Sequence, residues 1–195
     1  MPTSRLEAFS DGVLAIIITI MVLELRPPEG PTLGDLRDVG TGFLTYLLSF
    51  VYIGIYWNNH HHMFQLVHRI SGSVLWANLN LLFWLSLYPF TTAWMDETGL
   101  ARTPVVLYGI NLFVAGLAYY VLELTILRAE GSDGILAEAL GRDRKAKASL
   151  ALYALGIASA LWVTEWVALV FYAAVAAMWL VPDRRMEAFV AEHGT

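Results

Sequence analysis

Long apolar segments alternate with short polar ones along the chain, and the apolar segments have the length of membrane-crossing helices. A helix needs about 20 mostly apolar residues to cross roughly 30 Å of hydrocarbon. Charged or proline-containing stretches separate six such segments. The pattern therefore predicts an all-α, polytopic membrane protein whose 195 residues form a single six-helix transmembrane domain. The predicted spans cover about residues 4–25, 36–66, 71–94, 104–128, 148–163 and 166–181.

The composition agrees with this class and argues against several others. Hydrophobic residues make up 57% of the chain and charged residues only 15%, too few to cover the surface of a soluble domain. The chain has no cysteine, so it can form neither disulfides nor a thiolate metal site. No basic patch with interleaved aromatic residues indicates nucleic acid as a partner. No phosphate-binding loop or Ser/His/Asp arrangement is evident, so we expect neither an enzyme nor a cofactor.

The distribution of basic residues predicts the orientation in the membrane. With the amino terminus in the cytoplasm, nine Lys and Arg lie inside, whereas only Arg26, Arg37 and Arg102 lie outside. The nine are Arg5, Arg69, Arg128, Arg142, Arg144, Lys145, Lys147, Arg184 and Arg185. Cytoplasmic loops are enriched in such residues, so both termini are expected in the cytoplasm. The basic cluster in the polar linker should contact anionic lipid headgroups.

The first predicted span carries a charge at membrane depth. Only twelve uncharged residues separate Asp11 from Glu24, about 18 Å of helix at 1.5 Å per residue. This length is shorter than the hydrocarbon core, so at least one carboxylate lies within it. An ionised group at that depth must face water or a hydrogen-bonding protein group. The first helix therefore lies inside the protein or lines an aqueous path.

One face of this helix suggests a constriction. Gly12, Ile16, Thr19 and Leu23 recur at steps of four, three and four, with Ile20 at the edge of the stripe. Several copies around a symmetry axis would form an apolar ring that gates by dewetting. A ring of threonine oxygens beside it would replace part of an ion's hydration shell. The same spacing is also typical of a packed core helix, so both interpretations remain open.

A short motif at the start of the chain resembles a known family. Arg5, Phe9, Ser10 and Asp11 form the pattern R-x-x-x-F-S-D, which an apolar helix follows. Further similarities are Trp57 with His60–His62 in the second span, and Asn80–Phe83 with Pro89-Phe90 in the third. With its six spans, the chain resembles over most of its length the endolysosomal potassium channel called transmembrane protein 175 and its prokaryotic relatives.

The resemblance implies a fold, a function and a location. It implies a leak-type channel, permeable to potassium over sodium and to other monovalent cations, without the T-V-G-Y-G filter loop. It further implies a symmetric homotetramer in a prokaryotic plasma (inner) membrane, with the first helix of each subunit lining a central pore.

The resemblance also implies roles for individual residues. The apolar gate falls on Ile16, with further apolar levels at Ile20 and Leu23, and the selectivity threonine falls on Thr19. A structural network is implied for Arg5, Phe9, Ser10, Asp11, Trp57, His61 and Asn80. Since a buried carboxylate needs a cation or several donors nearby, we expect Arg5, His61 and Asn80 to be partners of Asp11.

The remaining polar residues suggest other functions. Consecutive helical residues point about 100° apart, so His60–His62 cannot all bind one metal ion, and hydrogen bonds between helices are favoured. A membrane metalloenzyme would need that metal. A proton- or ion-coupled transporter would use Asp11, Glu123 and the histidines, but it would usually contain Gly- or Pro-broken helices in paired halves of the chain, which the predicted spans do not show. A structural membrane protein without transport also remains possible.

Overall fold

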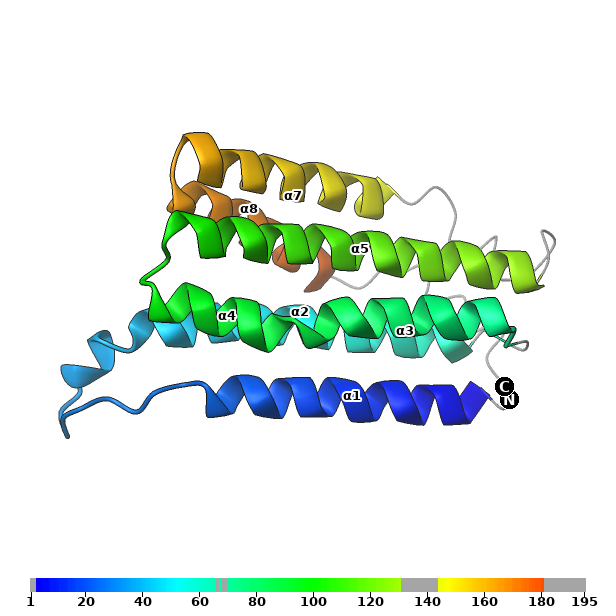
Figure 1. Ribbon diagram of the computed structural model, residues 1–195, viewed down its shortest axis with the longest axis horizontal. Coiled ribbons are helices and arrows are strands. Elements are labelled where there is room, and N and C mark those ends of the chain that lie inside the picture. Colours follow the sequence, from blue (N-terminus) through cyan, green and yellow to red (C-terminus); the bar gives the residue numbers. More distant parts are fainter. Residues whose placement is uncertain (1–2, 66, 68–69, 131–143, 181–195) are drawn as a thin grey trace.

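The computed structural model describes residues 3–65, 67, 70–130 and 144–180 (Figure 1). The helices run alongside one another in an elongated bundle. Their bounds are α1 Thr3–Leu23, α2 Gly40–Gln65, α3 Gly72–Ser86, α4 Tyr88–Glu97, α5 Arg102–Glu130, α7 Arg144–Trp162 and α8 Glu165–Leu180, and a 3₁₀ turn, η1 Asp35–Arg37, precedes α2. Predictions for Arg69, Arg142, Arg184, Arg185 and most of the polar linker concern positions outside the described residues.

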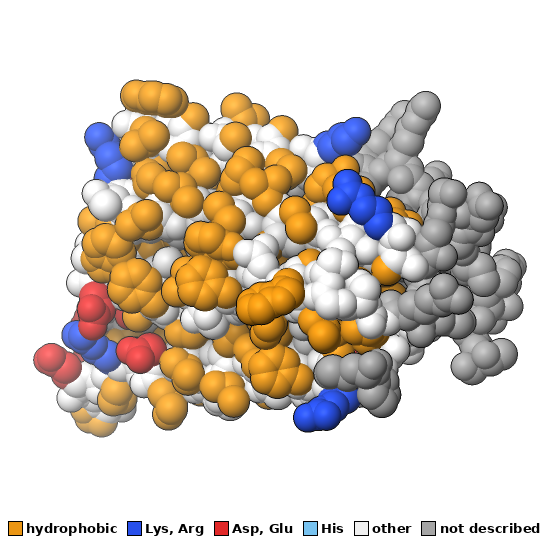
Figure 2. Space-filling view, turned by 45° about the vertical axis from the view of Figure 1, so that its right-hand side comes forward, with side chains coloured by type: hydrophobic (Ala, Val, Ile, Leu, Met, Phe, Trp, Pro, Cys, Tyr) orange, Lys and Arg blue, Asp and Glu red, His pale blue; other side chains and the backbone are white. Residues whose placement is uncertain are grey.

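Several of these helices suit a membrane. By length and composition, α1, α2 and the segment Arg102–Ala129 of α5 are long and apolar enough to cross one, and α8 is a shorter apolar helix. Apolar side chains cover much of the visible flank of the molecule, whereas charged ones gather toward its ends (Figure 2). This distribution is typical of a bundle that contacts hydrocarbon along its length and water at its ends.

The third predicted span differs from expectation because it consists of two helices. The helix α3 ends at Ser86 and α4 begins at Tyr88, with Pro89 in its first turn. Proline has no N–H and its ring clashes with the preceding turn, so the helix stops and restarts there. The predicted span of about 71–94 thus coincides with α3 and α4 together, and the break at Leu87 within it was not predicted. The second predicted span also starts too early, because α2 begins at Gly40.

Buried tyrosines hold four helices together. Tyr52 of α2, Tyr88 of α4, Tyr108 of α5 and Tyr172 of α8 are each at most 2% exposed. Successive ring centroids in this series lie 6.2, 6.0 and 5.9 Å apart. The Tyr52 hydroxyl donates a hydrogen bond to the Tyr172 carbonyl at 2.6 Å. Because these rings fill the centre of the bundle, they fix the framework against which α1 packs.

A glycine on α5 permits this packing, which leads to a stability prediction. A methyl group at Gly109 would overlap the Tyr172 hydroxyl and lie 2.9 Å from Cγ1 of Ile157. We expect Gly109→Ala to lower the free energy of unfolding by about 1–3 kcal/mol, since overpacking forces buried groups to move. Thermal unfolding of the purified protein in detergent measures the effect.

The matched control is Gly54→Ala in α2, where no atom lies within 4 Å of the added methyl group. This variant should melt at or above the wild-type temperature, because alanine favours helix over glycine. Equal melting temperatures for the Gly109 variant and the wild type would contradict the described contact of α5 with α8.

Candidate functional site

The two faces of α1 differ in what they contact. Leu6, Ser10, Leu14, Ile17 and Met21 are buried against the rest of the subunit. Gly12, Ile16, Thr19 and Leu23, which we call the outer stripe, are not among these buried residues. Ile16 is 58% exposed and Leu23 is 81% exposed. The alternative that this stripe belongs to the core of the subunit is therefore wrong.

The position of α1 explains why the outer stripe is uncovered. The helix lies along one edge of the bundle, with the other helices on one side only (Figure 1). Ile20, at the margin of the stripe, is 41% exposed. An apolar stripe on a helix of membrane length faces lipid, another protein surface or a narrow pore. In a single subunit the stripe is therefore available for assembly with other copies.

Thr19, the polar residue of the outer stripe, has a hydroxyl oxygen that can still accept hydrogen bonds or contact a cation. The Thr19 hydroxyl donates to the Ile16 carbonyl oxygen at 2.9 Å. A hydroxyl has one proton and two acceptor lone pairs, so donation to the backbone leaves the oxygen free to accept. Because this hydrogen bond lies at the exposed surface, the oxygen can contact water or a cation that approaches the outer stripe.

Behind the stripe, three buried polar side chains join α1, α2 and α3. The amide of Asn78 donates from Nδ2 to the Ser10 hydroxyl oxygen at 3.0 Å, and its Oδ1 lies 2.8 Å from Nε2 of His60. Ser10 in turn donates to the Leu6 carbonyl at 3.0 Å. All three side chains are at most 3% exposed. We call Ser10, His60 and Asn78 the buried polar layer.

The buried polar layer contains other residues of α2 and α3 than the two that were predicted as partners of α1. The interhelical contacts involve His60 and Asn78 rather than His61 and Asn80, both of which are exposed. Asn78 shares the buried face of α3 with Val74, Leu81 and Leu85. These four residues recur at steps of four, three and four, so their spacing could have identified the buried asparagine.

The buried polar layer leads to a second stability prediction. Replacing Asn78 with Ala removes a partner from both Ser10 and His60, and leaving buried polar groups unsatisfied costs about 1–3 kcal/mol. We expect a clearly lower melting temperature in detergent. Asn80→Ala, two residues along the same helix and exposed, should change stability by no more than about 0.5 kcal/mol. A larger loss at Asn80 than at Asn78 would contradict the hydrogen bonds described.

Asp11 lies outside the buried layer. Its Oδ1 accepts a hydrogen bond from Nε1 of Trp57 at 3.0 Å, and the His61 ring stacks on Trp57 with centroids 6.4 Å apart. Asp11 is exposed, and so are Arg5 and Phe9. Among the ion pairs of the described residues, none joins Arg5 to Asp11. The hydrogen-bond partner of Asp11 within the described subunit is therefore Trp57, and its pairing with Arg5 stays a prediction.

The remaining candidates are dispersed. His60 is buried, His61 is exposed and His62 is half-buried, so the three rings face different surroundings. Within the described segments, no three His, Asp or Glu side chains are arranged to hold a metal ion. Glu123 is buried on α5, at 6% exposure.

Charged side chains gather at the end of the bundle where α1 leads into the η1 loop. Arg26 pairs with Glu97 at 2.7 Å, and Arg102 contacts Glu165 at 3.4 Å. In the loop, the hydroxyl and amide of Thr32 donate to Asp35 and hold the pKa of this carboxyl below its ordinary value. Asp35 is therefore ionised at neutral pH, as expected for a group in water.

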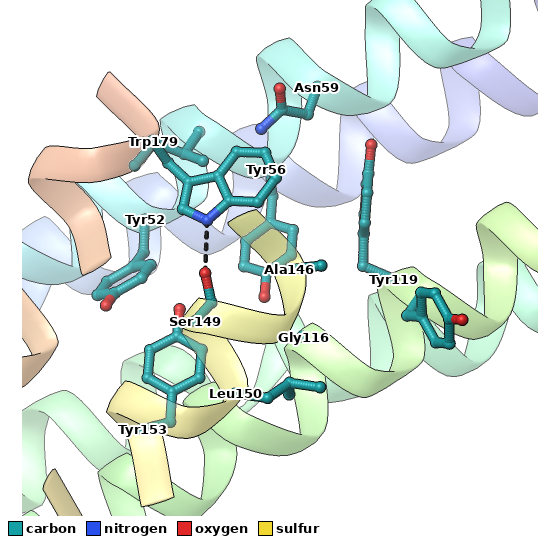
Figure 3. Close-up of a pocket in the computed structure, with 12 residues that line it drawn as sticks. Tyr52, Tyr56, Asn59, Gly116, Tyr119, Ala146, Ser149, Leu150, Tyr153 and Trp179 are labelled. Atoms are coloured by element: carbon teal, nitrogen blue, oxygen red, sulfur yellow. Dashed lines mark hydrogen bonds between the residues drawn. The ribbon is translucent and has the colours of Figure 1, made fainter. Parts of the chain in front are cut away.

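A small cavity lies apart from α1, between α2, α5, α7 and α8 (Figure 3). Its volume is about 50 Å³, and aromatic side chains that include Tyr56, Tyr119, Tyr153 and Trp179 line it. Two of the lining residues are hydrogen-bonded to each other, since Nε1 of Trp179 donates to the Ser149 hydroxyl at 2.8 Å. None of its lining residues belongs to α1, so it is not part of the outer stripe.

The fold and the site together define a multi-pass helical membrane protein whose first helix presents an apolar, threonine-bearing face to the outside of the subunit. Residues 5–89 match a family described as the endosomal/lysosomal potassium channel TMEM175. A potassium channel of Chryseobacterium sp. strain P1-3 is 51% identical over 193 residues, which cover 99% of this chain and 100% of that protein. The chain belongs to the TMEM175 family, a family of ion channels rather than enzymes, and the resemblance predicted from the R-x-x-x-F-S-D motif is confirmed.

Two further comparisons add structural and functional context. The crystal structure of a lysosomal potassium-selective channel TMEM175 homolog from Chamaesiphon minutus superposes with a TM-score of 0.80 at 27% identity. The match covers 94% of this chain and 97% of that one. The endosomal/lysosomal proton channel TMEM175 of Bos taurus is 29% identical over 143 residues, which cover 65% of this chain and 30% of that protein. The relatives thus include proteins named for potassium and for protons.

Proposed function

We propose that this chain is a leak-type cation channel that prefers potassium to sodium, formed by four copies around a central pore. The observation that carries the proposal is the exposure of the outer stripe. An apolar face with one threonine runs the length of a membrane-spanning helix, and no described part of its own subunit covers it. A pore lined by the first helix of each copy gives this face a function. The names of the bacterial relatives support potassium as the permeant ion.

Within this pore, Ile16 forms the gate. Its side chain lies in the middle of the stripe, where a ring of branched apolar groups excludes water when the helices are close. Ile20 and Leu23 add apolar levels toward the end of the helix. The Thr19 oxygen lies between Ile16 and Leu23, and its free lone pairs replace part of the hydration shell of a passing cation.

The distribution of charge supports an orientation with both termini in the cytoplasm of a bacterium, since nine Lys and Arg then lie inside its inner membrane and three outside. The loop that contains η1 then faces the exterior. The partners of the chain are its own copies, membrane lipids and monovalent cations.

A second candidate is a proton- or ion-coupled transporter that uses Asp11, Glu123 and His60–His62. One observation favours it: the helix breaks before Pro89, and discontinuous helices are common in secondary transporters.

Flux measurements in proteoliposomes distinguish these functions. Purified protein is reconstituted, and a potassium, sodium or proton gradient is applied with ion-sensitive dyes inside the vesicles. The channel proposal expects passive potassium flux that is faster than sodium flux and needs no second gradient. Potassium movement that occurs only when a proton gradient drives it, and saturates with concentration, would support the transporter instead.

A further inference from the structure

The cavity between α2, α5, α7 and α8 is lined mainly by aromatic and apolar side chains (Figure 3). Its volume of about 50 Å³ is several times the roughly 10–15 Å³ that one water molecule needs. Two of its polar groups are hydrogen-bonded already. The Ser149 hydroxyl donates to the Lys145 carbonyl and accepts from Trp179, and the Tyr52 hydroxyl donates to the Tyr172 carbonyl. Apolar cavities tend to stay dry and to take up apolar molecules, so an apolar occupant suits this one.

The cavity can be reached from the surface of the bundle that contacts the membrane. Tyr120 of α5, one of the lining residues, is 36% exposed, and Trp179 of α8 is half-buried. Along α7 the lining residues run from Ala146 to Tyr153, about 10 Å of helix at 1.5 Å per residue. In a bilayer the apolar groups that surround such a surface are lipid acyl chains. An acyl chain is therefore the occupant that the membrane supplies.

A positive charge lies at one end of the cavity. Nζ of Lys145 is 5.6 Å from the centroid of the Trp179 ring, and Lys145 directly precedes Ala146, the first lining residue of α7. The 19 residues of α7 form about 28 Å of helix, close to the roughly 30 Å of a hydrocarbon core. Lys145, in the first turn, therefore lies near the level of the lipid headgroups. An ammonium group has three N–H donors, so it can bind a phosphate oxygen while it contacts the ring.

We propose that Lys145 and this cavity together bind a phospholipid with an anionic headgroup. The phosphate contacts Nζ of Lys145, and part of one acyl chain packs against Tyr56 and Tyr153 in the cavity. Gly116 leaves room for the chain, because even a methyl group there would lie 3.6 Å from Leu150 and Tyr153. The charge selects the headgroup and the cavity holds the chain. None of these residues belongs to α1, so the site is independent of the proposed pore.

Trp179 is a built-in reporter of this site. Bromine atoms on an acyl chain quench the fluorescence of a tryptophan that they contact. The full chain is reconstituted in phosphatidylcholine vesicles that contain the same low fraction of brominated phosphatidylglycerol or brominated phosphatidylcholine. The chain has seven tryptophans, so the signal of Trp179 is the difference between the wild type and Trp179→Phe. We expect the anionic lipid to quench this signal about fivefold more, a preference that one basic residue near a membrane surface can supply. Equal quenching by the two lipids would overturn the proposal.

Two lysines of α7 separate the site from a general attraction of anionic lipid to a basic surface. Lys147 is exposed and lies about 200° around the helix from Lys145. Lys145→Gln should abolish the preference of the Trp179 signal for anionic lipid, whereas Lys147→Gln removes the same charge and should retain it. An equal effect of the two substitutions would show surface attraction only and overturn the site.

Two substitutions of Gly116 test whether the chain enters the cavity. Gly116→Leu fills the space and should remove the excess quenching of Trp179 by the anionic lipid. Gly116→Ala, whose methyl group fits at ordinary contact distances, should keep it. Undiminished quenching in a folded Gly116→Leu protein would overturn the placement of the chain. If that variant does not fold, the lysine pair decides the question. Potassium flux enters none of these measurements, so their failure would leave the channel proposal unaffected.

Discussion

Replacing Ile16 with Asn will raise potassium flux at least about tenfold. The wild-type side chain is 58% exposed on the outer stripe and forms the central apolar ring of the proposed pore. Water leaves such a constriction readily, and an ion that crosses it must lose hydration. An amide at this position holds water in the ring. A barrier lowered by about 1.4 kcal/mol is sufficient for a tenfold change in rate. Potassium flux per oligomer in proteoliposomes is the measurement.

Two controls separate this effect from a general disturbance of α1. Val22→Asn introduces the same amide on the same helix, about 120° around from Ile16, at a side chain that is 45% exposed. This variant should conduct like the wild type. Ile16→Leu keeps the ring apolar and should leave the flux low. Equal flux in Ile16→Asn and Val22→Asn would show that the ring at Ile16 is not the gate.

Replacing Thr19 with Val will reduce the preference for potassium over sodium by about threefold or more. The two side chains have nearly the same shape, so the substitution removes an oxygen from each copy and little else. Each hydrogen-bonding group is worth about 0.5–1.5 kcal/mol net, and a ring of them acts on every ion that passes. The ratio of potassium to sodium flux under identical gradients measures the change.

Thr19→Ser is the matched control for this prediction. Serine keeps the hydroxyl, which can still donate to the Ile16 carbonyl and leave its lone pairs for the ion. Selectivity in this variant should remain close to that of the wild type. If valine and serine gave the same flux ratio, the threonine oxygen would have no role in selectivity.

Hydropathy alone predicted the membrane-length helices α1, α2 and most of α5, because length and apolar content decide that property. The break before Pro89 was missed for a physical reason. Residues 71–94 remain apolar across the break, so a hydropathy pattern cannot detect the backbone N–H that proline lacks. Pro89, in the last third of the predicted span, was the available signal.

The candidate site could be predicted only in part, because spacing defines a stripe but not its surroundings. Ile16 and Ile17 are chemically identical, yet the first is 58% exposed and the second is 3% exposed. Their difference arises from how α1 packs on its neighbours. The same limit explains the polar residues, since adjacent positions point about 100° apart and His60 is buried while His61 is exposed.

If the outer stripe of α1 lines the path of the ion, a charged reagent attached to the stripe will block that path. The chain contains no cysteine, so a single introduced thiol is the only target for a charged thiol reagent. Leu23→Cys places the thiol at the exposed end of the outer stripe. Val22→Cys places it on the adjacent residue, which lies on another face of α1. We expect the reagent to block potassium flux through Leu23→Cys and to leave the flux through Val22→Cys unchanged. Complete labelling of Leu23→Cys with unchanged flux would contradict it.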